Sequence, residues 1–337
     1  MIKTRQELIE NPEENMRPHV VLLGAGASLA AFPQGDAKGQ KLPLMDNLVD
    51  ILDLQPILEK TSHHNGSEKN FEAIYGQLAS DPVYEGQVKE IEKRIFKYFS
   101  DLSIPLHATI YDQLLISLRP KDAIFTFNWD PFLFDAYQRN REAIPLPEIF
   151  FLHGNVRIGA CLEHDTWGAR QQKCPGCART FTDIPLLYPI EQKDYSANSY
   201  ISRNWEAAKS FFKEAFTLTI FGYGAPSSDT DAVELLRAAW TSRSDRTIEH
   251  IEVIDKGPHK RLYERWAPFT PSHHFRVRHT FDQSRIARWP RRSCESLRYP
   301  MMQGLPCEDF PLPAIPILSD LQQFASKITK YEKHQSC

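Results

Sequence analysis

The sequence predicts an α/β fold: a Rossmann-like parallel sheet with helices on both faces, an inserted helical module and a small zinc module. Five short apolar runs carry this prediction. Each ends in glycine or polar residues, as strands do when their carboxyl ends form a binding site. Between several runs, apolar residues recur at helical spacing. The expected strands are residues 19–23, 122–127, 149–152, 217–221 and 248–254.

The composition is that of an ordinary globular chain. It has 337 residues, 42% of them hydrophobic, and a formal net charge of -3, which gives no overall attraction to nucleic acid. No apolar run approaches the roughly 20 residues of a membrane span, and the charged N-terminus lacks the apolar centre of a signal peptide. We therefore expect a cytoplasmic protein with no membrane contact, in which six cysteines indicate metal binding or free thiols.

The expected organisation is a central domain with additions. Residues 1–17 are predicted to form an N-terminal arm or short leader helix, and residues 18–269 the central domain. A helical insertion at about 60–119 should contain three helices, and the loop at 32–43 is expected to be long and mobile. Residues 270–337 are the expected arginine-rich C-terminal extension, which ends in a helix.

The arginine-rich stretch at 273–298 has two interpretations. Its arginines could contact phosphates, or they could form a solvated or partner-facing surface. They are Arg276, Arg278, Arg285, Arg288, Arg291, Arg292 and Arg298.

The turn after the first strand contains Gly24, Ala25, Gly26 and Ser28. Glycine tolerates positive φ and lets a ligand approach the backbone, and a helix that follows would point its first amides at an anion. The alternative is a buried strand that ends in a purely structural turn, since the third glycine of the dinucleotide fingerprint is missing.

A cysteine cluster lies at about 157–181. Two pairs of ligand-type residues, each separated by two others, have the spacing of a tetrahedral Cys3His zinc site. With four protein ligands, such a site would be structural. The alternative is two unrelated turns, and Glu163, Asp165 or a residue outside the segment could replace the histidine as fourth ligand. The predicted ligands are Cys161, His164, Cys174 and Cys177.

The order of five motifs along the chain points to a known family. They are Gly-Ala-Gly-Ala-Ser at 24–28, Thr-Phe-Asn-Trp-Asp at 126–130, His-Gly at 153–154, the cysteine cluster, and Gly-Tyr-Gly-Ala-Pro-Ser-Ser-Asp at 222–229. This order resembles the sirtuin superfamily, and most closely the divergent sirtuin-like NAD-hydrolase domains of bacterial anti-phage defence proteins. The resemblance extends from about Pro18 to about Ile254.

The resemblance implies roles in NAD chemistry for three side chains. Asn128 would hold the ribose or the attacking water, and His153 would act as the base. Asp130 would fix the nicotinamide end or order the loop around Asn128. The structural alternatives are that Asn128 and Asp130 cap a helix and that His153 is a buried histidine with its hydrogen bonds satisfied.

The resemblance also implies a nucleotide site. Gly24, Ala25, Gly26 and Ser28 would cradle the phosphates. Gly222, Tyr223 and Ser227 would line the far side, and Asp255 would meet the adenosine ribose. Asp229 is expected only to cap the helix that follows it.

Two departures from the family pattern favour water over an acylated lysine as acceptor. Residues 30–36 do not match the segment that closes over nicotinamide in the deacylases, and Phe127 and Trp129 replace a glutamine and an aliphatic residue. The predicted function is therefore hydrolysis of NAD to nicotinamide and ADP-ribose, with structural Zn²⁺. The alternatives are an NAD-dependent protein deacylase and a non-catalytic nucleotide-binding scaffold.

The resemblance further implies a regulated, NAD-depleting effector of anti-phage defence. Such effectors are held inactive until a partner or an assembly state switches them on, so a homo-oligomer is expected. A separate partner would be of the kind of a DNA-translocating ATPase or an Argonaute-like protein, and the arginine-rich stretch could be its docking surface.

Overall fold

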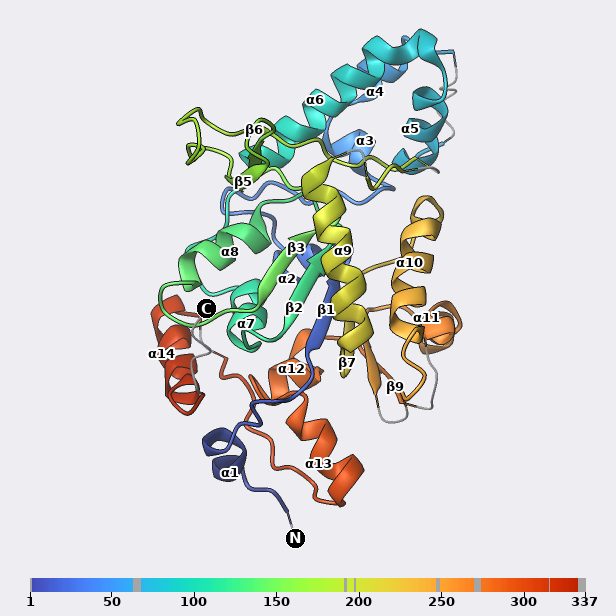
Figure 1. Ribbon diagram of the computed structural model, residues 1–337. Coiled ribbons are helices and arrows are strands. Elements are labelled where there is room, and N and C mark those ends of the chain that lie inside the picture. Colours follow the sequence, from blue (N-terminus) through green and yellow to red (C-terminus); the bar gives the residue numbers. More distant parts are fainter. Residues whose placement is uncertain are drawn as a thin grey trace.

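The central sheet of the computed structural model contains six parallel strands in the order β3-β2-β1-β7-β8-β9 (Figure 1). The structure describes residues 2–62, 68–190, 193–196, 198–246, 249–269, 274–314 and 316–332. The five predicted strands are confirmed, as β1 His19–Leu23, β2 Ala123–Thr126, β3 Glu148–Phe151, β7 Thr217–Phe221 and β8 His250–Ile254. The parallel α/β fold class is therefore correct.

The strand order changes direction between β1 and β7. From β1 the chain proceeds to β2 and β3 on one side, whereas β7, β8 and β9 follow one another on the other side. A sheet of this kind leaves a crevice at the carboxyl ends of the two strands where the order reverses. That crevice is where the polar ends of the predicted strands converge.

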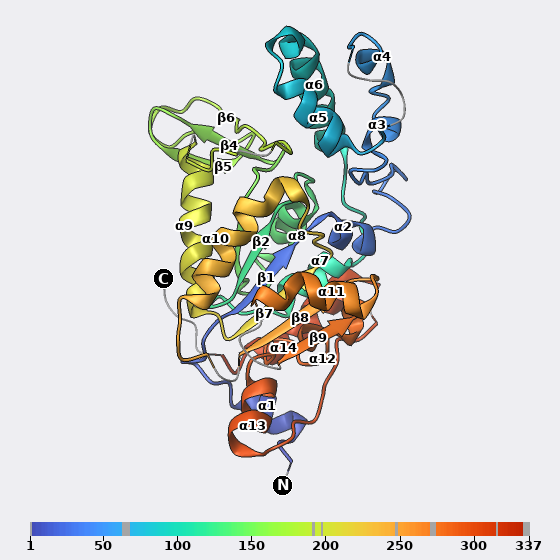
Figure 2. The same ribbon diagram turned by 90° about the vertical axis from the view of Figure 1, so that its right-hand side faces the viewer.

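Helices cover both faces of the sheet (Figure 2). One layer contains α9 (Ser199–Glu214) and α10 (Thr230–Thr241), which pack together, and the other contains α2 (Ala25–Ala31), α7 (Ile110–Ile116) and α8 (Phe132–Asn140). All five residues of β1, of β7 and of β8 are buried. Near-continuous apolar strands are typical of parallel sheets covered on both sides, which explains why these strands were recognisable in the sequence.

The helical insertion differs in extent from its prediction. The helices that project beyond the sheet are α3 (Leu48–Ile51), α4 (Gln55–Leu58), α5 (Phe71–Ala79) and α6 (Glu85–Asp101), with a 3₁₀ turn at Pro82–Tyr84 (Figure 1). We call α3–α6 the helical module. The third predicted helix, α7, instead packs against α8 in the layer on the sheet. Its apolar residues therefore belong to the sheet's core.

The loop at 32–43, predicted to be mobile, is held by one carboxylate. Asp36 is buried, and its two oxygens accept hydrogen bonds from the amides of Lys38, Gln40 and Ser103. Gly35 has a φ of +92°, and a Cβ there would lie 2.5 Å from the Gln40 carbonyl oxygen. The loop is thus fastened to the C-terminal end of α6.

The chain after residue 270 is not a separate extension. Strand β9 (Phe275–Arg278) completes the sheet beside β8, and α12 (Arg285–Arg288) contacts α7. Strand β9 was not predicted, because it is a short, half-exposed edge strand in which arginine alternates with apolar residues. The remaining elements are α1 Arg5–Glu10, α11 His259–Trp266, α13 Glu295–Gln303, α14 Leu318–Thr329, and 3₁₀ turns at Ala267–Phe269 and Phe281–Gln283.

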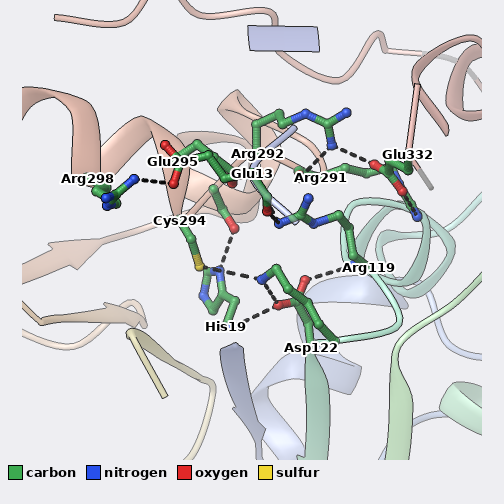
Figure 3. Close-up of polar contacts among 12 residues, drawn as sticks. Glu13, His19, Arg119, Asp122, Arg291, Arg292, Cys294, Glu295, Arg298 and Glu332 are labelled. Atoms are coloured by element: carbon green, nitrogen blue, oxygen red, sulfur yellow. Dashed lines mark hydrogen bonds and ion pairs between the residues drawn. The ribbon is translucent and has the colours of Figure 1, made fainter. Parts of the chain in front are cut away.

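Three of the seven arginines in the arginine-rich stretch are buried, which contradicts both interpretations of them as surface residues. Arg285, Arg291 and Arg292 are 8%, 2% and 0% exposed. The guanidinium of Arg291 donates to both carboxylate oxygens of Glu332, and that of Arg292 donates to Glu332 at 2.5 Å (Figure 3). These arginines therefore serve the fold rather than a phosphate or a partner.

The ion pairs of Arg291 and Arg292 with Glu332 belong to a larger group of charges that joins α1 to the C-terminal segment. Arg292 also donates to the carbonyl oxygens of Leu8 and Ile9, on α1. Nearby, Arg119 forms an ion pair with Glu295 at 2.9 Å, and Asp122 accepts from the amide of His19 at 2.8 Å (Figure 3). We call Arg119, Arg291, Arg292, Glu295 and Glu332 the terminal charge cluster. Helices α1 and α13, which the cluster joins, lie at the end of the molecule opposite the helical module (Figures 1 and 2).

No helix in the described ranges is long and apolar enough to cross a membrane.

The Glu332→Gln variant should be strongly destabilised. It removes the ion-pair partner of two buried guanidinium groups, and breaking a buried pair in this way costs about 3–5 kcal/mol. Urea unfolding measures the change, with Glu234→Gln as control, because Glu234 belongs to an exposed pair with Arg237 and should change stability by less than about 0.5 kcal/mol.

The pH dependence gives a second readout of the terminal charge cluster. Burial alone would raise the pKa of Glu332, but Arg291 and Arg292 lower it overall. The stabilisation is therefore present at neutral pH and is lost as the pH falls through the lowered folded-state pKa. Wild-type stability should fall more steeply on acidification than that of Glu332→Gln, and parallel curves would contradict the assignment.

Candidate functional site

A cavity of about 380 Å³ opens at the carboxyl edge of the sheet, in the crevice where the strand order reverses. It brings together nearly all the predicted catalytic and nucleotide-contacting residues. They are Gly24, Ala25, Gly26, Ser28, Asn128, Asp130, His153, Gly222, Tyr223 and Asp255. The side chain of the remaining predicted residue, Ser227, lies outside the described part of the structure.

The turns after β1 and β7 touch each other directly. A Cβ on Gly24 would lie 2.6 Å from the Gly222 carbonyl oxygen, and one on Gly222, whose φ is +59°, would lie 2.1 Å from the Ala27 amide nitrogen. The Gly26 amide donates to the Gly222 carbonyl at 2.9 Å. The glycines are thus required by the packing of two loops, a role that the sequence analysis did not foresee.

These contacts also occupy amides that were expected to cradle phosphates. Besides Gly26, the amide of Gly24 donates to the Phe221 carbonyl and that of Ala27 to the Gly24 carbonyl. A phosphate at this turn would have to draw on other donors.

Asn128, Ser28, Asp130 and Tyr111 form one buried hydrogen-bond network. The Asn128 side-chain amide donates to the Gly24 carbonyl and to the Ser28 hydroxyl, both at 3.0 Å. The Ser28 hydroxyl donates to Asp130 at 2.6 Å and lies 2.7 Å from the Tyr111 hydroxyl. Ser28 therefore ties the glycine turn to the loop after β2.

The network leaves one polar atom of Asn128 available. Within the described ranges, its side-chain oxygen accepts no hydrogen bond, although the residue lines the cavity. Both carboxylate oxygens of Asp130, in contrast, accept a hydrogen bond, one from Ser28 and the other from the Phe132 amide at 3.2 Å. Burial raises the pKa of Asp130 to about 6, although its hydrogen bonds from Ser28 and Phe132 favour the charged form.

His153 is buried, and its ring packs edge-on against Phe127, with the ring centres 4.7 Å apart. In the described part of the chain, its Nε2 has no hydrogen-bond partner. The alternative of a buried histidine with both nitrogens satisfied is therefore wrong for this atom. Burial lowers the pKa of His153 to about 4, so the ring is neutral at neutral pH.

Asp229 belongs to the site, although the sequence analysis expected only a helix cap. Its side chain caps no backbone amide of α10. Instead it accepts from the Lys193 ammonium at 2.7 Å and from the Tyr223 hydroxyl at 2.9 Å, and it lies 3.8 Å from Nε2 of His153. The motif at 222–229 named this residue, but no sequence signal pointed to Lys193.

One wall of the cavity is apolar and is formed by the helical module, the segment that precedes it, the loop after β2 and the segment after the zinc module. It includes Leu42, Leu44, Met45, Leu48, Phe99, Trp129, Leu187 and Pro189. A second cavity, of about 560 Å³, shares Gly26, Gly222 and Asp255 with the first and extends to the far side of the glycine turn. The two cavities together can take an elongated ligand across the turn.

The predicted metal ligands form a cluster on a separate small sheet. This antiparallel sheet has the order β5-β4-β6, with bounds β4 Ile158–Cys161, β5 Thr166–Ala169 and β6 Thr182–Asp183. One ligand atom from each predicted residue lies within 4.8 Å of the other three. The sequence prediction of this grouping, including His164, is confirmed.

The geometry of the cluster fits a tetrahedral zinc ion. The sulfur atoms of Cys161 and Cys177 are 3.8 Å apart, which matches the edge of a tetrahedron with Zn–S bonds of about 2.3 Å. The Gly176 amide donates to the Cys174 sulfur at 3.4 Å, which suits a thiolate. A Cβ on Gly176 would lie 2.3 Å from the His164 ring, so only glycine leaves room for that ligand.

Of three comparisons with known proteins, only the comparison with solved structures gives matches. No protein-family model matches the sequence, and no curated protein matches it. A Sir2 homologue in complex with NAD is similar at 12% identity and a TM-score of 0.43, over 97% of this chain and 96% of that chain. A variant Sir2 homologue with ADP-ribose has 12% identity, a TM-score of 0.41 and coverage of 98% and 99%.

A third similar structure is Sir2 in complex with an inhibitor, 2′-O-acetyl-ADP-ribose and a deacetylated peptide. It has 13% identity and a TM-score of 0.38, over 89% of this chain and 97% of that chain. Identity at this level leaves the chemistry of the site to be inferred from its own residues.

We predict that the Cys177→Ser variant loses zinc. Purified wild-type protein should contain about one Zn²⁺ per chain, whereas the variant should contain almost none, because a three-ligand site binds far more weakly. Elemental analysis measures the metal, and limited proteolysis should show new cleavage between residues 157 and 181. Cys307→Ser, outside the cluster, is the matched control. Equal zinc in both variants would contradict the site.

Proposed function

We propose that the protein hydrolyses NAD to nicotinamide and ADP-ribose. The observation that carries this proposal is the buried, neutral His153, whose Nε2 has no partner among the described residues and which shares a cavity with Asn128 and Asp130. A neutral imidazole can accept a proton. The cavity lies at the crevice where parallel α/β sheets bind nucleotides.

The proposed hydrolysis needs no covalent bond between the protein and the substrate. In hydrolysis the bond between ribose and nicotinamide breaks, its electron pair remains on the pyridine nitrogen, and the oxygen of water bonds to the ribose carbon. The ribose passes through an oxocarbenium-like state, as in glycoside hydrolysis. The proposed base, His153, takes one proton from the water.

The remaining residues would bind and orient NAD. The side-chain oxygen of Asn128, which accepts no hydrogen bond from the described residues, would accept one from the water or from a ribose hydroxyl. Asp130 would hold Ser28 and Asn128 in register rather than contact the ribose. The second cavity offers room for the adenosine end, with Asp255 at the boundary between the two.

A second candidate function is NAD-dependent deacylation. The observation that favours it is the apolar wall of the cavity, which suits an acyl chain. Water remains the first proposal because residues 30–36, Phe127 and Trp129 depart from the deacylase pattern in the sequence.

We further propose a biological role on the sequence resemblance alone. The protein would be a cytoplasmic, NAD-depleting effector of anti-phage defence that acts as a homo-oligomer with structural Zn²⁺. Its regulation would come from a separate partner of the kind of a DNA-translocating ATPase or an Argonaute-like protein. The burial of Arg285, Arg291 and Arg292 removes them from any docking surface for this partner.

The first test is incubation of the purified protein with NAD alone, followed by chromatography of released nicotinamide. Loss of a general base costs about 100-fold to 10,000-fold, so His153→Ala should reduce release by at least about 100-fold. His107→Ala, an exposed histidine, is the control. If NAD binds but the wild type releases no nicotinamide, autonomous hydrolysis is excluded.

An acyl-lysine peptide separates the two candidate functions. Hydrolysis predicts that nicotinamide release is unchanged when the peptide is added and that ADP-ribose is the product. Deacylation predicts release only with peptide, together with an acylated ADP-ribose. Mass spectrometry of the products decides between them.

A further inference from the structure

Two buried charged residues of the site have no role in the reaction as described above. Lys193 lies on the segment after the zinc module, and Asp229 on the connection between β7 and α10. Their side chains are 2% and 6% exposed. Charged groups are rarely buried to this extent without a function or a partner, because desolvation is costly.

The two residues form a compact group with fixed geometry. The Lys193 ammonium donates to one oxygen of Asp229 at 2.7 Å and to the Ser228 carbonyl at 2.5 Å. The other oxygen of Asp229 accepts from the Tyr223 hydroxyl. Both carboxylate oxygens are therefore held, and the carboxylate cannot turn away from the cavity.

His153 is the third member of the group. Its Nε2 lies 3.8 Å from the Asp229 oxygen that Lys193 also binds. That separation is too long for a hydrogen bond, yet unit charges so close interact strongly where both groups are buried. The carboxylate would therefore act on the ring chiefly when the ring is charged.

We propose that Asp229 and Lys193 are a positioning pair for His153: the carboxylate stabilises the imidazole once it has taken up a proton, and the ammonium limits that stabilisation, so that the resting imidazole is neutral. The role of this pair in catalysis rests on the proposed function. Its effect on the protonation of the His153 ring is independent of that function. The effect is the same whichever ring nitrogen takes the proton, since the positive charge is shared by both.

Among the residues that the structure describes, few other ionisable groups lie around His153. The ring of Tyr195, on the same segment as Lys193, lies parallel to the His153 ring with centres 6.4 Å apart. Asp229 faces Nε2 from the β7–α10 connection, and Tyr223 donates its hydroxyl to Asp229. Beyond these, Glu72 on α5 accepts from the Ser228 amide, and Asp231 lies at the start of α10. Burial lowers the pKa of His153, Asp229 opposes that change, and Lys193 adds to it.

The two charges therefore predict opposite shifts. In Lys193→Met the carboxylate is no longer neutralised, and the pKa of His153 should rise by about one unit or more, the usual effect of an opposite charge at this distance. In Asp229→Asn the ammonium remains and the pKa should fall. Lys193→Arg keeps the charge and should restore the wild-type value.

The shifts can be measured without substrate. NMR titration of full-length protein labelled with ¹³C at histidine Cε1 follows each imidazole, and His153→Gln identifies the signal. Lys260→Met, on the exposed side of α11, is the charge-matched control and should leave the signal unchanged. If Lys193→Met leaves the pKa of His153 at the wild-type value, the positioning pair is excluded.

Asp229→Asn, which is nearly isosteric, keeps the test decisive if Lys193→Met does not fold. In the Asp229→Asn variant, the His153 ring must stay neutral at the pH where the wild-type ring becomes charged. An unchanged midpoint of the His153 titration in this variant would overturn the proposal. Where NAD is cleaved, the acid limb of the kcat/KM profile should move with the NMR midpoint in each variant. An NMR shift without NAD cleavage would reject autonomous NAD hydrolysis and keep the pair, whereas cleavage without an NMR shift would reject the pair and keep the hydrolysis.

Discussion

The close approach of the turns after β1 and β7 is the constraint on which the site depends. These turns come from segments almost 200 residues apart, and they meet only because Gly24, Gly26 and Gly222 carry no side chain at the contact. The contact sets where Asn128 can reach the Gly24 carbonyl and where Tyr223 can reach Asp229. A methyl group at any of the three glycines would therefore disturb the polar network and the cavity together.

The site is built from two such networks, one on each side of the cavity. Ser28, Asn128 and Asp130 join the glycine turn to the loop after β2, while Lys193, Tyr223 and Asp229 join the segment after the zinc module to the loop after β7. His153, at the end of β3, lies between Phe127 and the second network. Each network fixes side chains by partners that are themselves buried, which is how a preorganised site is held.

The sequence predicts what depends on local pattern and misses what depends on distant pairing. The five inner strands are continuous apolar runs, and the metal ligands have diagnostic spacing, so both were recognised. Strand β9 was not recognised, because its apolar residues alternate with arginine at the edge of the sheet. The burial of Arg285, Arg291 and Arg292 was not recognised either, because a buried arginine and an exposed one look the same in a sequence. Asp229 was read as a cap for the same reason, since its partner Lys193 is 36 residues away.

The terminal charge cluster has a consequence for the order in which the chain can be assembled. Arg292 holds the carbonyl oxygens of Leu8 and Ile9, yet its counter-charge, Glu332, follows 40 residues later. During synthesis from the N-terminus, α1 therefore cannot be fixed in place until residue 332 has left the ribosome. Residues 8 and 9 are thus synthesised long before the residues that bind them, so the contact between α1 and the terminal charge cluster forms only after residue 332 has been translated.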